Sequence, residues 1–259
     1  MIARRLFHVS DVHFGREDGA AVAWFDRLVR EERPDAVVMT GDLTMRARAR
    51  EFAAGQAWLE SLGVPVTLEV GNHDLPYFNP VARLFYPYRR FRRVEHMVER
   101  PLDLPELLIA PLVTTARWQW RANWSKGHVS REALDRTLAL VRAAPPRALI
   151  FVACHHPLVE PHTRMSSRTR GGPHAFEALA RAGVHAVLTG HVHDPFDIAH
   201  EVAGRVVRLV GAGTLSERTR TSPPSFNEIR MIDGAFEVIR RTMTPEPDRV
   251  LKTQGPVLG

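Results

Sequence analysis

Five short groups of polar residues contain side chains of the types that can bind divalent metal ions. Each group combines aspartate, histidine or asparagine, in several cases beside a glycine, and each directly follows a short apolar run. In chain order the groups are Asp11-Val12-His13, Gly41-Asp42, Gly71-Asn72-His73-Asp74, His155-His156-Pro157 and Gly190-His191-Val192-His193. Carboxylate and imidazole ligands suit Mn, Fe, Zn or Co better than metals that prefer thiolates. The glycines allow sharp turns and a close approach of the backbone to an ion.

The elements before these groups explain how residues so distant in sequence can meet. The apolar runs predict buried strands at residues 6–10, 36–40, 64–70, 148–154 and 186–189. Apolar residues at helical spacing over residues 20–32 and 48–62 predict helices between the first three strands. This β-α-β-α-β pattern favours parallel strands covered by helices. Because the carboxyl ends of parallel strands share one edge, we expect all five groups to converge there.

No single group would be decisive, because a lone buried histidine is more often a packed core residue than a ligand. The alternation of side chains along an extended chain places Asp11 and His13 on one side, and His191 and His193 likewise. Five compatible groups in order are hard to attribute to chance.

The rest of the chain reads as one domain. We expect irregular chain with short helical pieces over 75–93, a strand at 107–110, a helix from the Ser130 cap to residue 142, and a short helix at 176–181. Alternating patterns at 196–202, 205–210, 226–232 and 236–241 predict antiparallel strands. The predicted organisation is a single domain over residues 1–244 and a loose tail over 245–259.

Composition excludes several classes of protein. The chain has 259 residues, 44% hydrophobic and 25% charged, which is typical of a globular protein. Cys154 is the only cysteine, so no intramolecular disulfide can form and a reducing compartment fits best. The apolar runs are too short for a signal peptide or a membrane span. We therefore expect a cytoplasmic protein, and its net charge of +6 favours anionic partners or simple solubility.

The polar groups carry a resemblance to a known superfamily. In order and spacing they are similar to the five motifs of the calcineurin-like metallophosphoesterases, over Leu6 to His193. By size and motif context the chain is most similar to the bacterial class III cyclic-nucleotide phosphodiesterases within that superfamily. The resemblance implies an α/β fold, a two-sheet β-sandwich flanked by helices (αββα).

The resemblance also implies a role for each motif residue. One metal would be held by Asp11, His13, Asp42 and His193, and the second by Asp42, Asn72, His155 and His191, with Asp42 bridging. His73 would lie beside the metals without binding them, and Asp74 would orient it. The ligand set is complete, which disfavours a non-enzymatic, metal-stabilised scaffold. Many relatives have an Asp-Ser or Asp-Thr pair where this chain has Leu112-Val113-Thr114-Thr115.

The expected reaction is hydrolysis of a phosphoester with two divalent metal ions, Mn, Fe or Zn, as cofactors. Two such ions lower the pKa of a bridging water, and the hydroxide attacks phosphorus in line. His73 would stabilise the transition state or protonate the leaving oxygen. The leading substrate is a phosphodiester in a small nucleotide, such as a cyclic nucleotide. The alternatives are a lipid headgroup or lipid precursor at a membrane surface, and a nuclease, although no domain that grips a duplex follows.

Three further segments bear on the choice of substrate. Residues 117–124 mix Trp118, Trp120 and Trp124 with arginine, and we favour packing of the tryptophans on the sheet over a base-stacking wall. Three arginines follow His155 in the chain, and they would either bind a phosphate or form a solvated charged loop: Arg164, Arg168 and Arg170. Residues 78–93 alternate apolar residues with arginine, and we favour a packed cap with a basic rim over a surface that contacts an anionic membrane.

Overall fold

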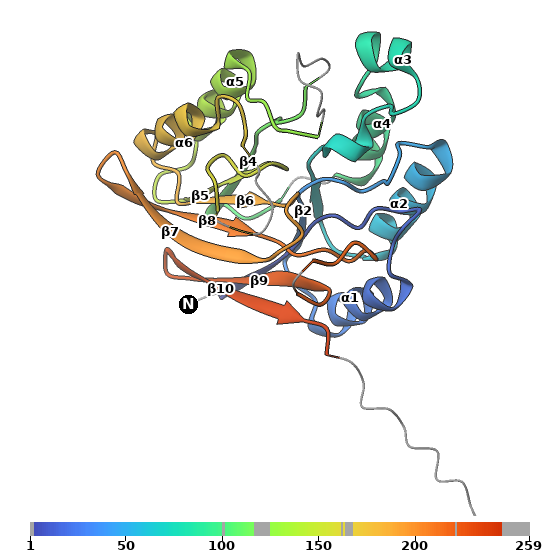
Figure 1. Ribbon diagram of the computed structural model, residues 1–259. Coiled ribbons are helices and arrows are strands. Elements are labelled where there is room, and N and C mark those ends of the chain that lie inside the picture. Colours follow the sequence, from blue (N-terminus) through green and yellow to red (C-terminus); the bar gives the residue numbers. More distant parts are fainter. Residues whose placement is uncertain are drawn as a thin grey trace, which may run out of the picture.

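Two β-sheets lie face to face at the centre of the protein, and helices cover their outer faces (Figure 1). This computed structural model describes residues 3–99, 102–116, 125–161, 163, 168–220 and 222–244. The strands are β1 (Arg4–Val9), β2 (Ala36–Met39), β3 (Val66–Leu68), β4 (Leu107–Pro111), β5 (Leu149–Ala153), β6 (Ala186–Thr189), β7 (Phe196–Val202), β8 (Arg205–Gly211), β9 (Ser225–Ile232) and β10 (Ala235–Thr242). The helices are α1 (Gly19–Glu32), α2 (Ala49–Ser61), the 3-10 helix η1 (Asn72–Asp74), α3 (Pro80–Phe85), α4 (Arg89–Val98), α5 (Arg131–Arg142) and α6 (Gly172–Arg181).

The centre of each sheet is parallel, as the strand–helix alternation predicts. The first sheet has the order β10-β9-β1-β2-β3, and the second has the order β4-β5-β6-β8-β7. Strands β1, β2 and β3 run parallel, and so do β4, β5, β6 and β8. The carboxyl ends of these strands therefore lie along a common edge in each sheet.

The tail strands differ from the expectation at one place. Strands β9 and β10 return to the first sheet and pair antiparallel with β1 and with each other. Strand β7 pairs antiparallel with β8, but β8 pairs parallel with β6. The prediction of purely antiparallel tail strands was wrong for β8, because the β7–β8 hairpin adds its second strand to the parallel part of the sheet and leaves β7 at the edge. The carboxyl end of β8 therefore joins the same edge as those of β5 and β6.

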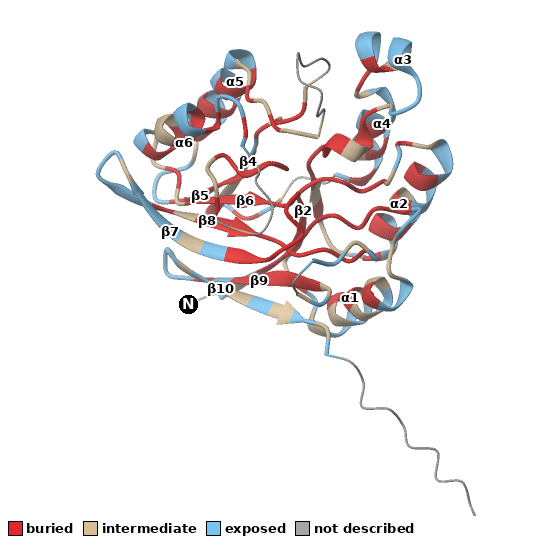
Figure 2. Cartoon of the chain, viewed as in Figure 1, coloured by how far each residue is buried: buried red, intermediate tan, exposed pale blue. Residues whose placement is uncertain are grey.

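Side chains on the central strands are buried on both faces, which explains their continuous apolar runs. Phe7 and Val9 point from β1 toward the helices of the first sheet, whereas Leu6 points into the layer between the sheets, where it packs near Phe151 and Leu188. The central strands are correspondingly buried along most of their length (Figure 2). These two layers of packing hold the strand ends in fixed positions.

The segment after η1 is only partly a packed cap. Pro87 lies between α3 and α4, so the two helices form one after the other instead of as a single helix. Helix α4 buries Phe91 and Val94 against the first sheet's core. Helix α3 instead leaves its apolar residues exposed, so the expectation of a packed cap is wrong for α3. The physical reason is that Arg83 occupies the one buried position of that short helix.

Candidate metal centre

The structure brings the five polar groups together at the carboxyl edge of the two sheets. Each candidate ligand belongs to a turn that directly follows a strand, and all of them are buried. The first sheet contributes Asp11, His13, Asp42 and Asn72, and the second contributes His155, His191 and His193. Within the described residues, sets of three of their ligand atoms lie within 4.8 Å of one another. The predicted convergence is therefore what the fold produces.

One half of the cluster lies around Asp11. The Oδ1 atom of Asp11 is 3.1 Å from Nε2 of His193 and 3.5 Å from Nε2 of His13. The two imidazole Nε2 atoms are themselves only 3.2 Å apart. Oδ2 of Asp42 lies 3.8 Å from Nε2 of His13. The ligand atoms of Asp11, His13 and His193 all lie within 4.8 Å of one another, and Asp42 adjoins them through His13.

The other half lies on the opposite side of Asp42. The same Oδ2 atom is 3.3 Å from Nε2 of His155, which in turn lies 3.1 Å from Oδ1 of Asn72. His191 approaches from the turn after β6, and its ring centre is 5.2 Å from that of His155. Oδ2 of Asp42 is therefore shared by both halves of the cluster.

Backbone carbonyls hold two of the imidazoles in the orientation that a metal ligand needs. Nδ1 of His155 donates to the carbonyl of Thr40 at 2.9 Å, and Nδ1 of His193 donates to the carbonyl of Arg218 at 2.8 Å. A neutral imidazole that donates from Nδ1 has an unprotonated Nε2. Such outer hydrogen bonds fix the tautomer and the ring direction of metal-binding histidines.

The types and positions of these donor atoms suit a pair of divalent cations. Oδ1 of Asp11 and Nδ1 of His13 are buried atoms without a hydrogen-bond partner among the described residues. Buried polar atoms are nearly always satisfied, so an unsatisfied carboxylate oxygen facing two close imidazole nitrogens requires an explanation. A cation bound to Oδ1 of Asp11 and to Nε2 of His13 and His193 would satisfy that carboxylate oxygen, and the mixture of O and N donors suits Mn, Fe or Zn.

The charges of the cluster support the same conclusion. Burial raises the pKa of Asp11, but His193 and His13 outweigh burial and hold that pKa well below its ordinary value. Burial likewise raises the pKa of Asp42, but His155 and His73 outweigh it, so the net shift is downward. Burial, followed by the nearby His155, lowers the pKa of His191 to about 3. Burial lowers the pKa of His155, but Asp42 outweighs burial and raises it to about 9, so a cation that binds there must displace the proton of this imidazole. The two carboxylates and His191 already have the ionised and neutral forms that bind metal ions.

The turns that carry the candidate ligands adopt an uncommon backbone conformation. Positive φ angles occur at Asp11 (56°), His13 (53°), Asp42 (52°), His191 (71°) and His193 (62°). Residues other than glycine rarely adopt this left-handed region, and strained positions of this kind cluster at functional sites. The conformation turns each side chain inward, toward its neighbours from the other sheet.

Glycine at position 190 is required by the closeness of the two sheets. A Cβ atom on Gly190 would lie 1.8 Å from Oγ of Ser10 and 2.5 Å from Oδ2 of Asp11. The same Oδ2 accepts a hydrogen bond of 2.8 Å from the backbone N–H of His191. The glycine thus lets the turn after β6 approach the turn after β1, which brings together ligands from both sheets.

His73 lies beside the cluster, but Asp74 does not orient it as expected. Nδ1 of His73 pairs with the carbonyl of Met45 at 2.7 Å, and its backbone N–H donates to Oδ1 of Asp42 at 2.8 Å. The Asp74 carboxylate points the other way and accepts from Thr44 N and Oγ1 and from Gly71 N, at 2.8, 2.9 and 3.0 Å. Asp74 therefore holds two ligand turns together, and the Met45 carbonyl orients the His73 ring.

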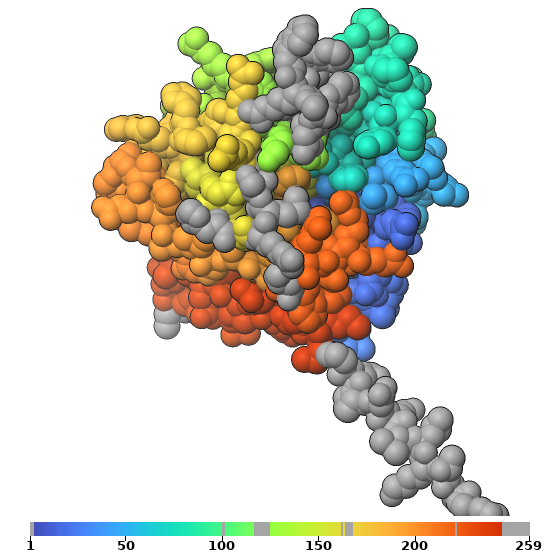
Figure 3. Space-filling view, in the orientation of Figure 1, coloured from blue at the N-terminus to red at the C-terminus, as the bar shows by residue number. Residues whose placement is uncertain are grey.

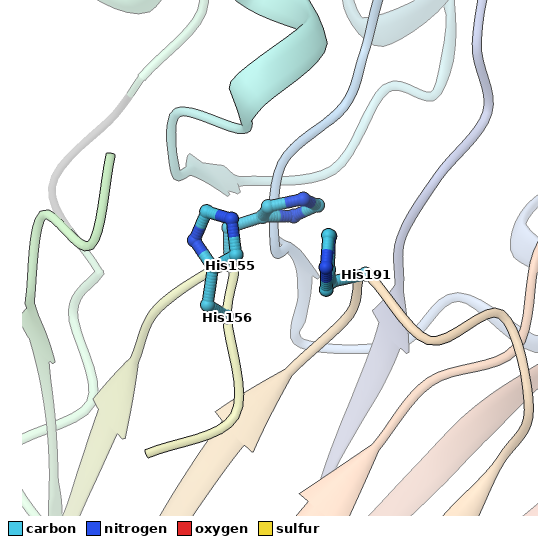
Figure 4. A group of neighbouring side chains, drawn as sticks. All are labelled: His155, His156 and His191. Carbon is cyan, nitrogen blue, oxygen red and sulfur yellow. The ribbon is translucent and has the colours of Figure 1, made fainter. Parts of the chain in front are cut away.

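His156 is close to His155 and His191 but is a structural residue. Figure 4 shows His155 and His156 leaving one turn in different directions, with His191 beside them. Nδ1 of His156 pairs with Oγ1 of Thr114 at 2.9 Å, and Nε2 with the carbonyl of Ser125 at 2.9 Å. Both ring nitrogens are therefore occupied. Thr114 thus helps fix the chain next to the site.

Sequence reasoning missed Arg218, which reaches into the cluster from the loop after β8. Its Nη1 atom lies 3.1 Å from Nε2 of His73 and 3.4 Å from Nε2 of His13. In the sequence, the alternating run at 205–210 ends in Gly211-Ala212-Gly213 just before this loop, and glycines also precede several of the predicted ligands. Reading that run as a further parallel strand would have placed the loop at the site.

The segments expected to select the substrate are only partly described. Trp118, Trp120 and Trp124 lie outside the described residues, and so does Arg164. Arg168 and Arg170 are exposed, and the backbone of Arg170 pairs with the chain at Gly127 and Val129. Their part in binding phosphate stays a prediction.

Comparison with known proteins decides the family. Residues 4–195 match the family model described as calcineurin-like phosphoesterase. The chain belongs to this family. The family is described by phosphoester hydrolysis, and a dinuclear metal centre is typical of it.

Two curated relatives are similar to parts of the chain. A glycerophosphodiester phosphodiesterase from Enterobacter lignolyticus is 33% identical over 93 residues, which cover 30% of this chain and 34% of that protein. A probable cyclic nucleotide phosphodiesterase from Rhodococcus erythropolis is 27% identical over 177 residues, which cover 62% and 52% respectively. The chain thus spans about a third and about a half of the length of these two relatives.

Solved structures confirm the αββα fold of the family. A dimetal phosphatase from Danio rerio superposes with a TM-score of 0.68 at 12% identity, covering 93% of this chain and 99% of the other. A purple acid phosphatase from yellow lupin seeds gives a TM-score of 0.65 at 13% identity, covering 93% and 52%. Within the described residues, no helix combines the length and apolar character needed to cross a bilayer.

Proposed function

We propose that this protein hydrolyses a phosphodiester in a small nucleotide, including cyclic nucleotides, at two metal ions bound by the cluster. Both curated relatives carry names of phosphodiesterases, one for a glycerophosphodiester and one for a cyclic nucleotide. This supports a diester over a monoester. The observation that carries the proposal is the shared position of the Asp42 carboxylate between the two groups of donors.

The proposed ligand sets follow the two halves of the cluster. Asp42 would bridge the two ions. The first set is Asp11, His13, Asp42 and His193, and the second is Asp42, Asn72, His155 and His191. The short distances from Asp42 to His13 and to His155 support this division. When bound, two divalent ions supply a water of lowered pKa and neutralise charge on the phosphoryl oxygens.

Two other side chains would act on the ester itself. The Arg218 guanidinium is placed to donate to a phosphoryl oxygen, because its Nη1 reaches the imidazoles of the cluster. Nδ1 of His73 is held by Met45 and its Nε2 faces Nη1 of Arg218, so this imidazole would stabilise the ester or, once protonated, give a proton to the leaving oxygen. Burial of the ligand turns keeps bulk water away from these groups.

A comparison of substrates tests the proposal directly. The purified protein, loaded with Mn²⁺, is assayed on a cyclic nucleotide, on bis-p-nitrophenyl phosphate and on p-nitrophenyl phosphate, before and after chelation. We expect the two diesters to be hydrolysed with higher kcat/KM than the monoester, and all activity to disappear on chelation. Faster hydrolysis of the monoester would contradict the diester proposal while leaving the metal-dependent chemistry intact.

A further inference from the structure

Helix α3 carries its charge inside and its apolar side chains outside. Arg83 is only 7% exposed, whereas Val81 and Phe85 are 64% and 63% exposed. A helix packed on a core has the opposite pattern, and α4 follows that rule, since it buries Phe91 and exposes Arg92. The inverted pattern of α3 does not stabilise the isolated protein, because it leaves apolar surface in water.

The exposed apolar residues are concentrated in this one segment. Six of the ten large hydrophobic residues that are exposed in the described part of the chain lie between positions 77 and 86. These six, here called the α3 apolar surface, are Tyr77, Phe78, Val81, Leu84, Phe85 and Tyr86. Helix α3 stands at the outer edge of the molecule and is largely exposed (Figures 1 and 2). In the space-filling view, the segment containing α3 and α4 forms the raised upper right rim (Figure 3). Concentrated exposed apolar residues mark an interaction site.

A strongly basic surface adjoins the α3 apolar surface. Residues 75–94 contain five arginines and no acidic residue. Arg89, Arg90 and Arg93 line a groove of about 430 Å³ together with Tyr86. Two of these arginines also line a second groove, of about 330 Å³, between α4 and α2. Tyr86 belongs both to the α3 apolar surface and to the lining of the first groove, so aromatic and cationic side chains adjoin there.

We propose that the α3 apolar surface and the adjoining arginine groove dock the protein onto an anionic lipid bilayer. Aromatic and aliphatic side chains enter the boundary between headgroups and acyl chains, and arginines bind the lipid phosphates. A second copy of this chain is a poorer partner, because a symmetric contact would bring the same arginines face to face. The chain's net charge of +6 adds to the attraction of an anionic surface.

The position of the docking surface relates it to the metal centre. Tyr77 follows Asp74, the last residue of η1, by three positions, and η1 contains Asn72 and His73. Nη1 of Arg90 donates to the carbonyl of Ala47 at 2.7 Å, which ties α4 to the loop before α2. The docking surface is thus anchored next to the turns that carry the ligands. Docking would place the site's rim at the level of the lipid headgroups.

Vesicle flotation tests the docking surface. The metal-loaded full chain is mixed with phosphatidylcholine vesicles, with or without phosphatidylglycerol. We expect it to float only with phosphatidylglycerol, and less in high salt. The paired changes Phe85→Ser with Tyr86→Ser, and Arg89→Gln with Arg93→Gln, should each lower binding about tenfold. Val206, which is 64% exposed, and Arg131, which is also exposed, lie on other surfaces. The changes Val206→Ser and Arg131→Gln are therefore matched controls and should bind vesicles like the parent.

The docking proposal would be overturned if the parent did not float with phosphatidylglycerol, or if both paired variants floated as well as the parent. It would also be overturned if the parent did not float but formed a dimer in ultracentrifugation that Phe85→Ser dissociates. Melting curves check that every variant is folded. Hydrolysis of bis-p-nitrophenyl phosphate in solution is measured in parallel, and the Phe85→Ser variant should retain it. Loss of hydrolysis with intact flotation would reject the proposed function and leave the docking surface standing.

Discussion

At the residue scale, His73 can be separated from the ligands by experiment. Its ring is held by Met45 and faces Arg218, and its backbone contacts Asp42. We expect His73→Ala to keep the metal content of the parent and to lose turnover by about a hundredfold or more, the usual contribution of a positioned acid. Elemental analysis and steady-state assays on bis-p-nitrophenyl phosphate measure the two effects.

Asp42→Ala is the matched contrast for His73→Ala. It removes the carboxylate shared by both halves of the cluster, so both metal content and turnover should fall. Retention of two metals by Asp42→Ala would show that the ligand assignment is wrong, and parental turnover in His73→Ala would remove that imidazole from the mechanism.

Arg218 gives a second prediction at the residue scale. Its guanidinium faces His13 and His73, while its backbone carbonyl accepts from His193. Arg218→Gln keeps the carbonyl and removes the charge, so kcat/KM should fall about tenfold or more with unchanged metal content. Arg220→Gln, an exposed arginine of the same loop, is the control and should behave as the parent. Identical kcat/KM values for the two variants would exclude a role for Arg218 in substrate binding.

At the element scale, the strands that precede the ligand groups could be predicted because each is a short apolar run ended by a polar turn, and the later strands because their residues alternate. The prediction of β8 was incomplete, since alternation in Arg205–Gly211 reveals a strand but not its direction relative to β6. The orientation of Asp74 could not be read either, because it depends on hydrogen bonds from Thr44 and Gly71 that no local pattern encodes. The inversion of α3 likewise depends on which face of a short helix meets the core.

Helix α4 gives a prediction about pH. Its Glu95 lies near Glu69 and Glu99, and Glu99 accepts a hydrogen bond from Leu68 N at the edge of the first sheet. Burial, and then Glu99, raises the pKa of Glu95 from 4.5 to about 7, against an opposing effect of Arg92. Because the folded pKa is the higher one, ionisation destabilises the fold: the stability associated with Glu95 is complete below about pH 4.5 and is lost as the pH rises through about 7.

Glu95→Gln should therefore stabilise the protein at pH 8 by about 1 kcal/mol, after allowance for solvent screening, and should have little effect at pH 4.5. Urea unfolding of parent and variant at both pH values measures the difference. An equal difference at the two pH values would mean that the ionisation of Glu95 does not affect stability.

At the scale of the whole molecule, the metal centre joins the two sheets. Asp11 and Asp42 come from the first sheet, and His155 and His193 from the second, so bound ions would cross-link both layers. Ions that bind only the folded protein stabilise it by about 2.7 kcal/mol at a hundred times Kd. Adding Mn²⁺ to the chelated protein should therefore raise Tm by roughly 5–10 °C. Asp42→Ala should show little shift, and an unchanged Tm in the parent would speak against a cross-link.

The left-handed turns have a consequence for any attempt to make this protein more heat-resistant. Each of the five candidate ligands held at positive φ costs the fold on the order of 1 kcal/mol or more. Glycine at His13 or His191 would relieve that cost and remove a donor atom in the same step. Selection of variants for thermal stability alone, without selection for turnover, should therefore accumulate glycine at these positions, and the most stable variants would be inactive.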